Sequence, residues 1–151
     1  MLYSFLAGSD GAQPYAGLIA VKGTLYGTTA AGGVNGNGTV FSVTTTGVET
    51  VLHSFGGGSD GVQPWAALIN VKGTLYGTTL GGGANGFGTI FRATTTGDEN
   101  ALYSFGGGSD GAYPYAELMN VNGTLYGTSL HGGGRGCLDH SGCGTSFAFT
   151  P

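Results

Sequence analysis

The sequence predicts an all-β protein built from β-propeller blades. Three observations indicate this fold class. The 151 residues consist of three copies of one unit of about fifty residues. β-Branched and aromatic residues gather in four short segments of each unit, and glycine-rich connections separate these segments. Four antiparallel strands repeated every 40 to 50 residues or so are typical of a propeller blade, and we therefore expect three four-stranded blades per chain.

The repeat is defined by blocks of sequence that recur in all three copies. Residues 1–151 form a single repeat domain, with units of about 1–50, 51–100 and 101–151 and a loop insertion at 132–144 in the third copy. In order along the unit, the recurring blocks are Leu-Tyr-Ser-Phe, Gly-Ser-Asp-Gly, a following proline, Gly-Thr-Leu-Tyr-Gly-Thr, and Gly-Thr-x-Phe. All three copies contain them, except that His replaces Tyr in the first block of the second copy.

Each unit is expected to contain four strands joined by two short and two long connections. Tight hairpin turns are predicted at Val21-Lys22-Gly23 and at 45–48, whereas 30–38 and 56–64 are long and rich in glycine. No helical period is present, so we expect essentially no helix. In a propeller, the two long connections emerge on the same face. In the first unit the predicted strands are Ala16–Val21, Thr24–Thr29, Thr39–Thr44 and Glu49–Phe55.

The two ends of the chain divide one blade between them. Met1–Phe5 matches the fourth strand of a unit, and Pro151 follows the third strand of the last unit. Propellers typically have about 4 to 8 blades, so three are too few to close a ring. We therefore predict strand exchange between chains, which removes open sheet edges. A homodimer with six blades is favoured, a trimer with nine is the alternative, and a head-to-tail filament forms if the ring does not close.

Charge and hydropathy exclude several classes of partner. The net charge is −4, and the four basic residues are scattered, whereas nucleic-acid binding needs clustered Lys and Arg. No apolar run approaches the roughly 20 residues that span a bilayer. Residues 1–10 show neither a basic nor a long apolar region, so no signal peptide is visible. We expect no cofactor.

The recurring blocks resemble the GloVer tandem repeat of exported bacterial proteins. The resemblance covers the whole chain, because the blocks that begin at Leu2, Gly23 and Gly38 match in all three copies. It implies an extracellular or cell-envelope location. It implies no catalytic residues, and the three copies here come without an anchor segment.

The loops between fourth and first strands hold the candidate ligand-binding residues. An aromatic ring beside carboxyl or amide groups suits a sugar, which presents an apolar face and a rim of hydroxyls. The alternatives are that the rings fill space between blades and that each Asp-Gly pair shapes a turn, a calcium site being a minor possibility because each loop offers one carboxylate. The candidates are Asp10, Gln13, Tyr15, Asp60, Gln63, Trp65, Asp110, Tyr113 and Tyr115.

The insertion in the third copy contains both cysteines. A disulfide between Cys137 and Cys143 is predicted, which suits an oxidising compartment. The alternative is a metal site in which His131 and His140 join the two thiolates, although this spacing is unfamiliar for such sites.

Taken together, these residues predict a binding or scaffold protein rather than an enzyme. No positioned nucleophile and base are visible, and His53, which replaces Tyr in a strand motif, is expected to be structural. The first hypothesis is a non-catalytic module that binds glycans through its repeated loops. The second is a structural extracellular protein that assembles by strand exchange, and an enzyme acting on polysaccharides ranks third.

Overall fold

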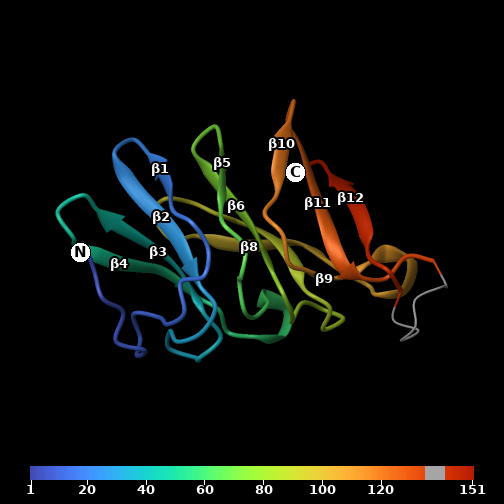
Figure 1. Ribbon diagram of the computed structural model, residues 1–151, viewed down its shortest axis with the longest axis horizontal. Helices are drawn as coiled ribbons and strands as arrows, with labels where there is room; N and C mark the ends of the chain where they lie inside the picture. Colours follow the sequence, from blue (N-terminus) through green and yellow to red (C-terminus); the bar gives the residue numbers. More distant parts are fainter. Residues whose placement is uncertain (135–141) are drawn as a thin grey trace.

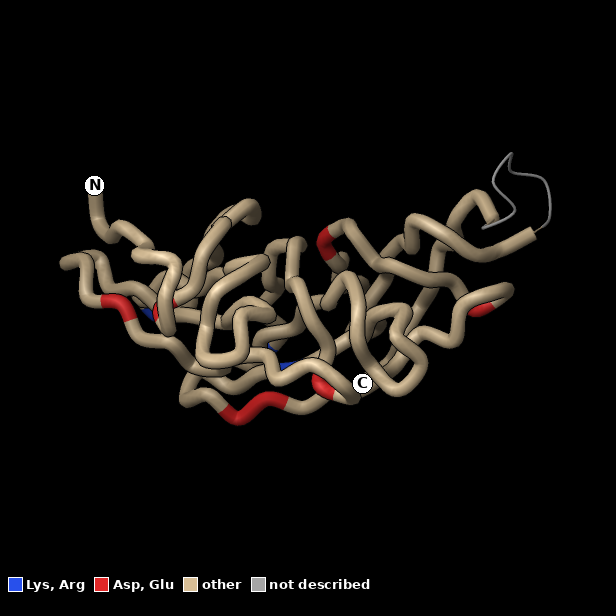
Figure 2. The backbone as a smooth tube through the Cα atoms, turned by 90° about the horizontal axis from the view of Figure 1, so that it is seen from below, with Lys and Arg blue, Asp and Glu red and all other residues tan. Residues whose placement is uncertain are grey.

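The computed structural model describes residues 1–134 and 142–151, which form three four-stranded antiparallel sheets. The sheets lie side by side in chain order (Figure 1). They follow a shallow arc on which charged residues are sparse (Figure 2). The predicted all-β blade architecture is therefore confirmed. The strands are β1 (Ile19–Val21), β2 (Thr24–Thr29), β3 (Thr39–Thr44) and β4 (Glu49–Ser54); β5 (Ile69–Val71), β6 (Thr74–Thr79), β7 (Thr89–Ala93) and β8 (Glu99–Ser104); and β9 (Ala112–Pro114), β10 (Met119–Val121), β11 (Thr124–His131) and β12 (Thr145–Phe149).

The predicted strand boundaries hold for the middle of each unit and fail at its start. β2 and β3 have the predicted bounds, and β4 ends one residue earlier than predicted. The first strand was predicted over Ala16–Val21 but begins only at Ile19. Pro14 lies just upstream and has no N–H to donate to a neighbouring strand. In this region the chain pairs with the sheet through the single bridge Ala12–Ala31. Two single-turn 3₁₀ helices, η1 (Gly58–Asp60) and η2 (Gly108–Asp110), are the helical segments of the described residues.

The hairpin between β1 and β2 explains why these two strands pair in one register. Lys22 and Gly23 have φ angles of 49° and 84°. Positive φ at both central residues defines the type I′ turn, whose twist matches that of the paired strands. Val21 consequently lies opposite Thr24, and Ile19 lies opposite Tyr26.

The hydrophobic core lies between the sheets rather than within one sheet. Between the first two sheets, Tyr26 and Val40 pack with Leu68 and Phe91, and Phe55 fills the outer end of the same cluster. A second cluster of the same kind joins the second and third sheets. Each sheet therefore depends on its neighbours for burial, as expected of a repeat architecture.

The two long connections meet at one end of the sheets, as predicted. The N–H of Gly83 donates to the carbonyl of Gly58, which joins a β6–β7 loop to a β4–β5 loop. The N–H of Gln63 donates to the carbonyl of Asn37 at 2.8 Å, and this bond joins the second unit to the first. Neighbouring units are thus linked by backbone hydrogen bonds as well as by apolar packing.

The N-terminal segment differs from the sequence prediction in an informative way. Residues 1–5 are not assigned as a strand, since no neighbouring strand is there to pair with them. They nevertheless have the position of a fourth strand: a Cβ on Gly47 would lie 2.5 Å from the Leu2 carbonyl oxygen, and a Cβ on Gly97 would lie 2.6 Å from that of Leu52. At the other end, β12 pairs with β11 but with no outer strand of the described residues.

Within 1–134 and 142–151, no helix has the length and apolar character needed to span a bilayer.

Candidate functional site

Each unit places an aspartate where its carboxylate contacts residues four and seven positions earlier in the chain. Asp10 accepts from the N–H of Leu6 at 2.7 Å and from the Tyr3 hydroxyl at 3.0 Å. These bonds, the Leu6 N–H first, hold the pKa of Asp10 below its usual value. In the third unit Asp110 accepts from the Tyr103 hydroxyl in the same way. The interpretation of these aspartates as turn builders agrees with this geometry.

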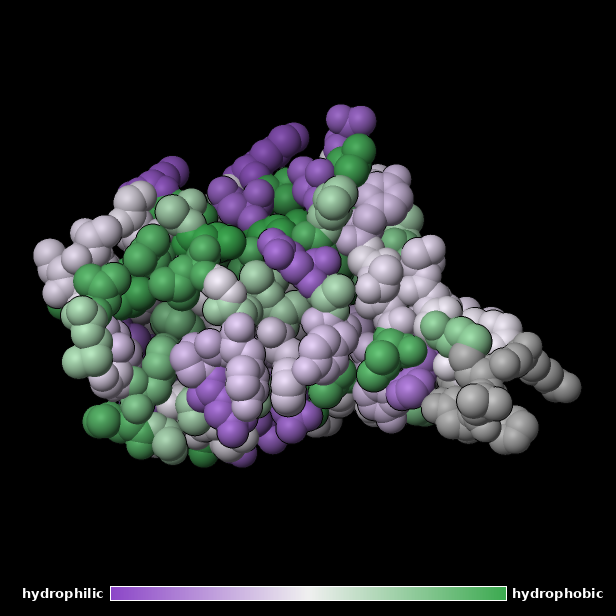
Figure 3. Space-filling model, viewed as in Figure 1, coloured by the Kyte–Doolittle hydropathy of each residue, from purple (hydrophilic) through white to green (hydrophobic). Residues whose placement is uncertain are grey.

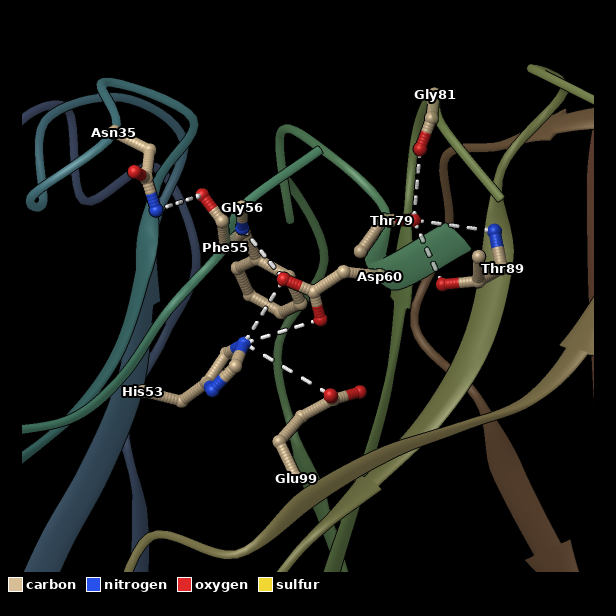
Figure 4. A network of polar contacts seen from close by, with 9 residues as sticks. All are labelled: Asn35, His53, Phe55, Gly56, Asp60, Thr79, Gly81, Thr89 and Glu99. Atoms are coloured by element: carbon tan, nitrogen blue, oxygen red, sulfur yellow. Dashed lines mark hydrogen bonds and ion pairs between the residues drawn. The ribbon is translucent and has the colours of Figure 1, made fainter. Parts of the chain in front are cut away.

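The second unit differs because His53 takes the place of the tyrosine. His53 Nε2 lies 3.2 Å from Asp60 Oδ1 and 3.3 Å from Oδ2. It also lies 3.8 Å from Glu99 Oε2, so the imidazole stands between two carboxyl groups (Figure 4). The three side chains come from β4, η1 and β8 and therefore span the junction of the first two sheets. Their ligand atoms all lie within 4.8 Å of one another.

Glu99 is the most buried member of this trio. Its side chain is 5% exposed, against 22% for His53 and 24% for Asp60. Glu99 Oε1 is buried and has no hydrogen-bond partner among the described residues. Burial, followed by the proximity of Asp60, raises the pKa of Glu99 to about 8. The carboxyl group thus holds a proton at neutral pH when no cation compensates its charge.

Glu49 has the corresponding position in the first unit. Its Oε1 is likewise buried without a partner among the residues described. Burial raises the pKa of Glu49, and the nearby Asp10 adds to the effect. The residue that accompanies this pair is Tyr3, whose hydroxyl donates to Asp10. The first unit therefore repeats the two carboxyl groups without the imidazole.

Sequence reasoning missed both glutamates. A signal for them exists, since Glu49 and Glu99 are fifty residues apart in a chain with only eight acidic residues. His53 was interpreted as structural, and its bond to Asp60 is indeed the equivalent of the tyrosine bond in the other units. What the sequence did not show is that Glu99, from the next sheet, approaches the same imidazole.

The three aromatic residues that follow the prolines form one stack. The ring of Trp65 lies 4.8 Å from Tyr15 at an interplanar angle of 22°, and 5.2 Å from Tyr115 at 43°. The alternative that these rings fill space between blades agrees with this contact. Tyr15 ends the stack and is 61% exposed, and Trp65 Nε1 is buried without a partner in the described part of the chain.

The residues just before the prolines are constrained by their backbone. Gln13, Gln63 and Tyr113 have φ angles of 60°, 58° and 57°, in the left-handed region. The Gln13 carbonyl accepts from the N–H of Ala30 at 3.1 Å. These three candidates therefore help to join the long connections, and the side chains of both glutamines are exposed.

Two apolar grooves lie at opposite ends of the row of sheets. One, of about 340 Å³, is lined by Leu2, Phe5, Leu18 and Val43 on the first sheet. The other, of about 490 Å³, is lined by Met119, Tyr126 and Phe147 on the third sheet. Figure 3 shows apolar residues (green) gathered on the side of the molecule where the first sheet lies.

The insertion in the third unit is largely outside the described residues. Cys137 and His140 belong to that segment, so the predicted disulfide with Cys143 and the alternative metal site stay predictions. The ring of His131, the other candidate ligand, lies edge-on to Tyr113 with centroids 5.6 Å apart.

Comparison with known proteins finds one match. A family model described as the Gloeobacter/Verrucomicrobia repeat matches residues 1–151. No curated protein and no solved structure matches the chain.

Proposed function

The chain belongs to the Gloeobacter/Verrucomicrobia repeat family, and from this premise we propose that it is a non-catalytic scaffold module that completes a β-propeller with a second copy of itself. Two chains with three sheets each make a ring of six blades, within the usual range of about 4 to 8. The first groove of one copy receives the third sheet of the next.

The observation that carries this proposal is the exposure of one leucine in three equivalent positions. Leu68 is 0% exposed and Leu118 is 3% exposed, because the preceding sheet covers each of them. Leu18 is 48% exposed, since no sheet precedes the first. Burial of a leucine side chain contributes about 1.5 to 3 kcal/mol, so the first sheet gains from a cover.

The opposite face of the third sheet offers the cover that fits. Tyr26 faces the second sheet and is 6% exposed, whereas Tyr126, its equivalent, is 44% exposed. Thr28 donates to the Ala66 carbonyl across the first junction, while its equivalent Thr128 is exposed. A second copy placed on the third sheet as the second sheet is placed on the first gives Thr128 the Ala16 carbonyl as acceptor. The apolar part of this interface then recurs around the ring, whereas the threonine bond does not, because Thr78 Oγ1 at the second junction has no partner among the described residues.

The N-terminal segment supplies the strand that the third sheet lacks. In the first sheet Thr39 lies opposite Ser54 and Val40 opposite His53. The equivalent register pairs Thr145 of one copy with Ser4 of the next, and Ser146 with Tyr3. The open edge of β12 is then closed, which protects it from nonspecific pairing.

The test is the native mass of the full chain by light scattering. We expect a discrete dimer for the wild type and a monomer for Leu18→Glu, which places a charge in the interface. Val34→Glu is the matched control, because Val34 is 79% exposed on a loop away from both grooves. A discrete trimer would mean a ring of nine blades in place of six. Polydisperse polymers would contradict a closed ring, and a wild-type monomer at all concentrations would contradict self-assembly.

Glycan binding is the second candidate, favoured by the free face of Tyr15 at the end of the aromatic stack. Gln13, two residues before it, has an exposed amide that suits sugar hydroxyls. In the proposed ring, Tyr115 of the next copy would lie against this face, as successive rings lie against one another within a chain, so this candidate applies to a chain whose first sheet is uncovered. A glycan array at micromolar protein tests this, with Tyr15→Ala as the variant. Binding that Tyr15→Ala leaves unchanged, or no binding at all, contradicts it.

The family resemblance also supports an exported or envelope location, which we keep as part of the proposal. Fractionation of the cells that produce the protein tests it, and recovery in the cytoplasmic fraction alone contradicts it.

A further inference from the structure

His53, Asp60 and Glu99 form a cluster that neither the repeat nor the proposed assembly explains. Each comes from a different segment, and each directs its polar atoms to a common point (Figure 4). A hydrogen bond between His53 and Asp60 would serve to hold the turn, as the tyrosines do in the other units. It leaves the approach of Glu99 to the same imidazole unexplained.

Glu99 provides a second and independent sign of a ligand. Its side chain is 5% exposed, and Oε1 has no hydrogen-bond partner in the described part of the chain. Ionisation of a buried carboxyl group without a partner is costly, and a carboxylate beside it increases the cost. A cation between the two groups removes this cost.

The distances suit a small transition-metal ion. Zinc binds imidazole nitrogen and carboxylate oxygen at about 2.0 to 2.2 Å, so neighbouring ligand atoms of a tetrahedral site are about 3.3 Å apart. His53 Nε2 lies 3.2 Å from Asp60 Oδ1 and 3.8 Å from Glu99 Oε2. All three ligand atoms lie within 4.8 Å of one another, so the side chains must close from at most this separation to coordinate one ion.

The surroundings already orient two of the ligands. The N–H of Gly56 donates to Asp60 Oδ2, whereas Oδ1, which lies 3.2 Å from His53 Nε2, is the oxygen that would coordinate. The ring of Phe55 lies edge-on to the imidazole, with centroids 4.9 Å apart. Such contacts restrict ligand orientation and support metal affinity.

We propose that His53, Asp60 and Glu99 bind one divalent transition-metal ion of the zinc type, which joins β4 of the first sheet to β8 of the second. Three protein ligands leave a fourth position for water, on the side where His53 and Asp60 are partly exposed. The mixture of imidazole and carboxylate ligands favours zinc over magnesium, which prefers oxygen ligands and near-octahedral geometry.

The first unit is an internal control for this proposal. Glu49 and Asp10 repeat the carboxyl pair, but Tyr3 replaces the histidine, and a neutral phenol is a poor ligand at neutral pH. The third unit has Tyr103 at this position. We therefore expect one ion per chain at such junctions rather than one per unit.

The experiment is calorimetric titration of Zn²⁺ into the full chain after removal of metals with a chelator. His53→Tyr is the central variant, because it recreates the tyrosine–aspartate bond of the other two units and should keep the fold. We expect saturable binding to the wild type and a loss of at least about tenfold in affinity for both His53→Tyr and Glu99→Gln. Glu49→Gln should bind as the wild type does.

A double variant, Cys137→Ser with Cys143→Ser, separates this site from the insertion. Binding that persists in the double variant and is lost in His53→Tyr supports the proposal. Binding that is unchanged in His53→Tyr, or absent from the wild type at micromolar Zn²⁺, overturns it. The second readout is thermal unfolding: Zn²⁺ should raise the melting temperature of the wild type and leave that of His53→Tyr unchanged, since only a ligand bound to the folded state stabilises it.

Discussion

The ring of Phe5 lies edge-on to the ring of Phe41, with centroids 4.9 Å apart and an interplanar angle of 73°. Phe55 and Phe91 repeat this contact at 5.2 Å and 70°. A residue of the N-terminal segment thus packs on the first sheet as a residue next to β4 packs on the second. The N-terminal segment therefore makes the side-chain contacts of a fourth strand, although no strand of the described residues pairs with it.

This equivalence predicts different results for one substitution at two sites. Phe55 is completely buried, so Phe55→Ala should lower the free energy of unfolding by about 3 to 5 kcal/mol. Phe5 is only partly buried, so Phe5→Ala should cost less in the monomer while weakening the dimer. Urea unfolding and native mass measure the two effects. Equal losses in unfolding free energy would show that residues 1–5 already belong to the core of a single chain.

A pair of hydroxyl groups joins the second and third strands of each sheet and is buried in the first two sheets. Thr79 Oγ1 donates to the Gly81 carbonyl, lies 2.8 Å from Thr89 Oγ1, and accepts from the Thr89 N–H. Thr79→Val keeps the shape and removes these bonds, so we expect a loss of about 1 to 3 kcal/mol in the free energy of unfolding. Thr50→Val, at an exposed position of β4, is the control and should change stability little. Equal effects would contradict a role for the buried pair.

The sequence predicted the strands best where local turn chemistry defines them. Lys22-Gly23 forms a hairpin turn, and β2 consequently has its predicted bounds. β1 is shorter than predicted because the one bridge in this region is made by Ala12, before Pro14, and residues 15–18 form no bridge to the sheet. Local pattern does not distinguish a residue that packs beside a strand from one that pairs with it.

The candidate site was less predictable than the fold for a physical reason. The contact between His53 and Glu99 joins different sheets, and it depends on how closely the blades pack. A glutamate at the start of a strand is usually solvated, so Glu99 alone gave no sign of burial. The contact of Tyr15 with Trp65 agrees with the alternative that these rings fill space between blades.

The buried carboxyl group of Glu49 predicts a pH dependence of stability. Because burial raises its pKa above 4.5 in the folded chain, the folded state binds the proton more tightly than the unfolded state. The contribution of the protonated group is complete below pH 4.5 and is lost as pH rises through the raised pKa. Glu49→Gln should therefore gain stability relative to the wild type as pH rises above 4.5. Urea unfolding at a series of pH values measures this difference, and a difference independent of pH would contradict it.

Gly61 is a position where an added side chain should be strongly destabilising. Its φ is +99°, and an added Cβ would lie 2.4 Å from Thr79 Oγ1, within the hydroxyl pair just described. Gly73 is the control: its φ is +91°, but an added Cβ would have no atom within 4 Å. A substitution at Gly73 therefore measures the backbone strain alone, without a clash. We expect Gly73→Ala to cost about 1 kcal/mol of unfolding free energy. Gly61→Ala should cost at least about 1 to 3 kcal/mol more, because Thr79 cannot move without breaking its bonds to Gly81 and Thr89. Urea unfolding of both variants measures the difference. If both variants lost the same unfolding free energy, the segment around Gly61 would be able to move away from Thr79 at little cost. The close approach of Gly61 to Thr79 would then contribute nothing to stability.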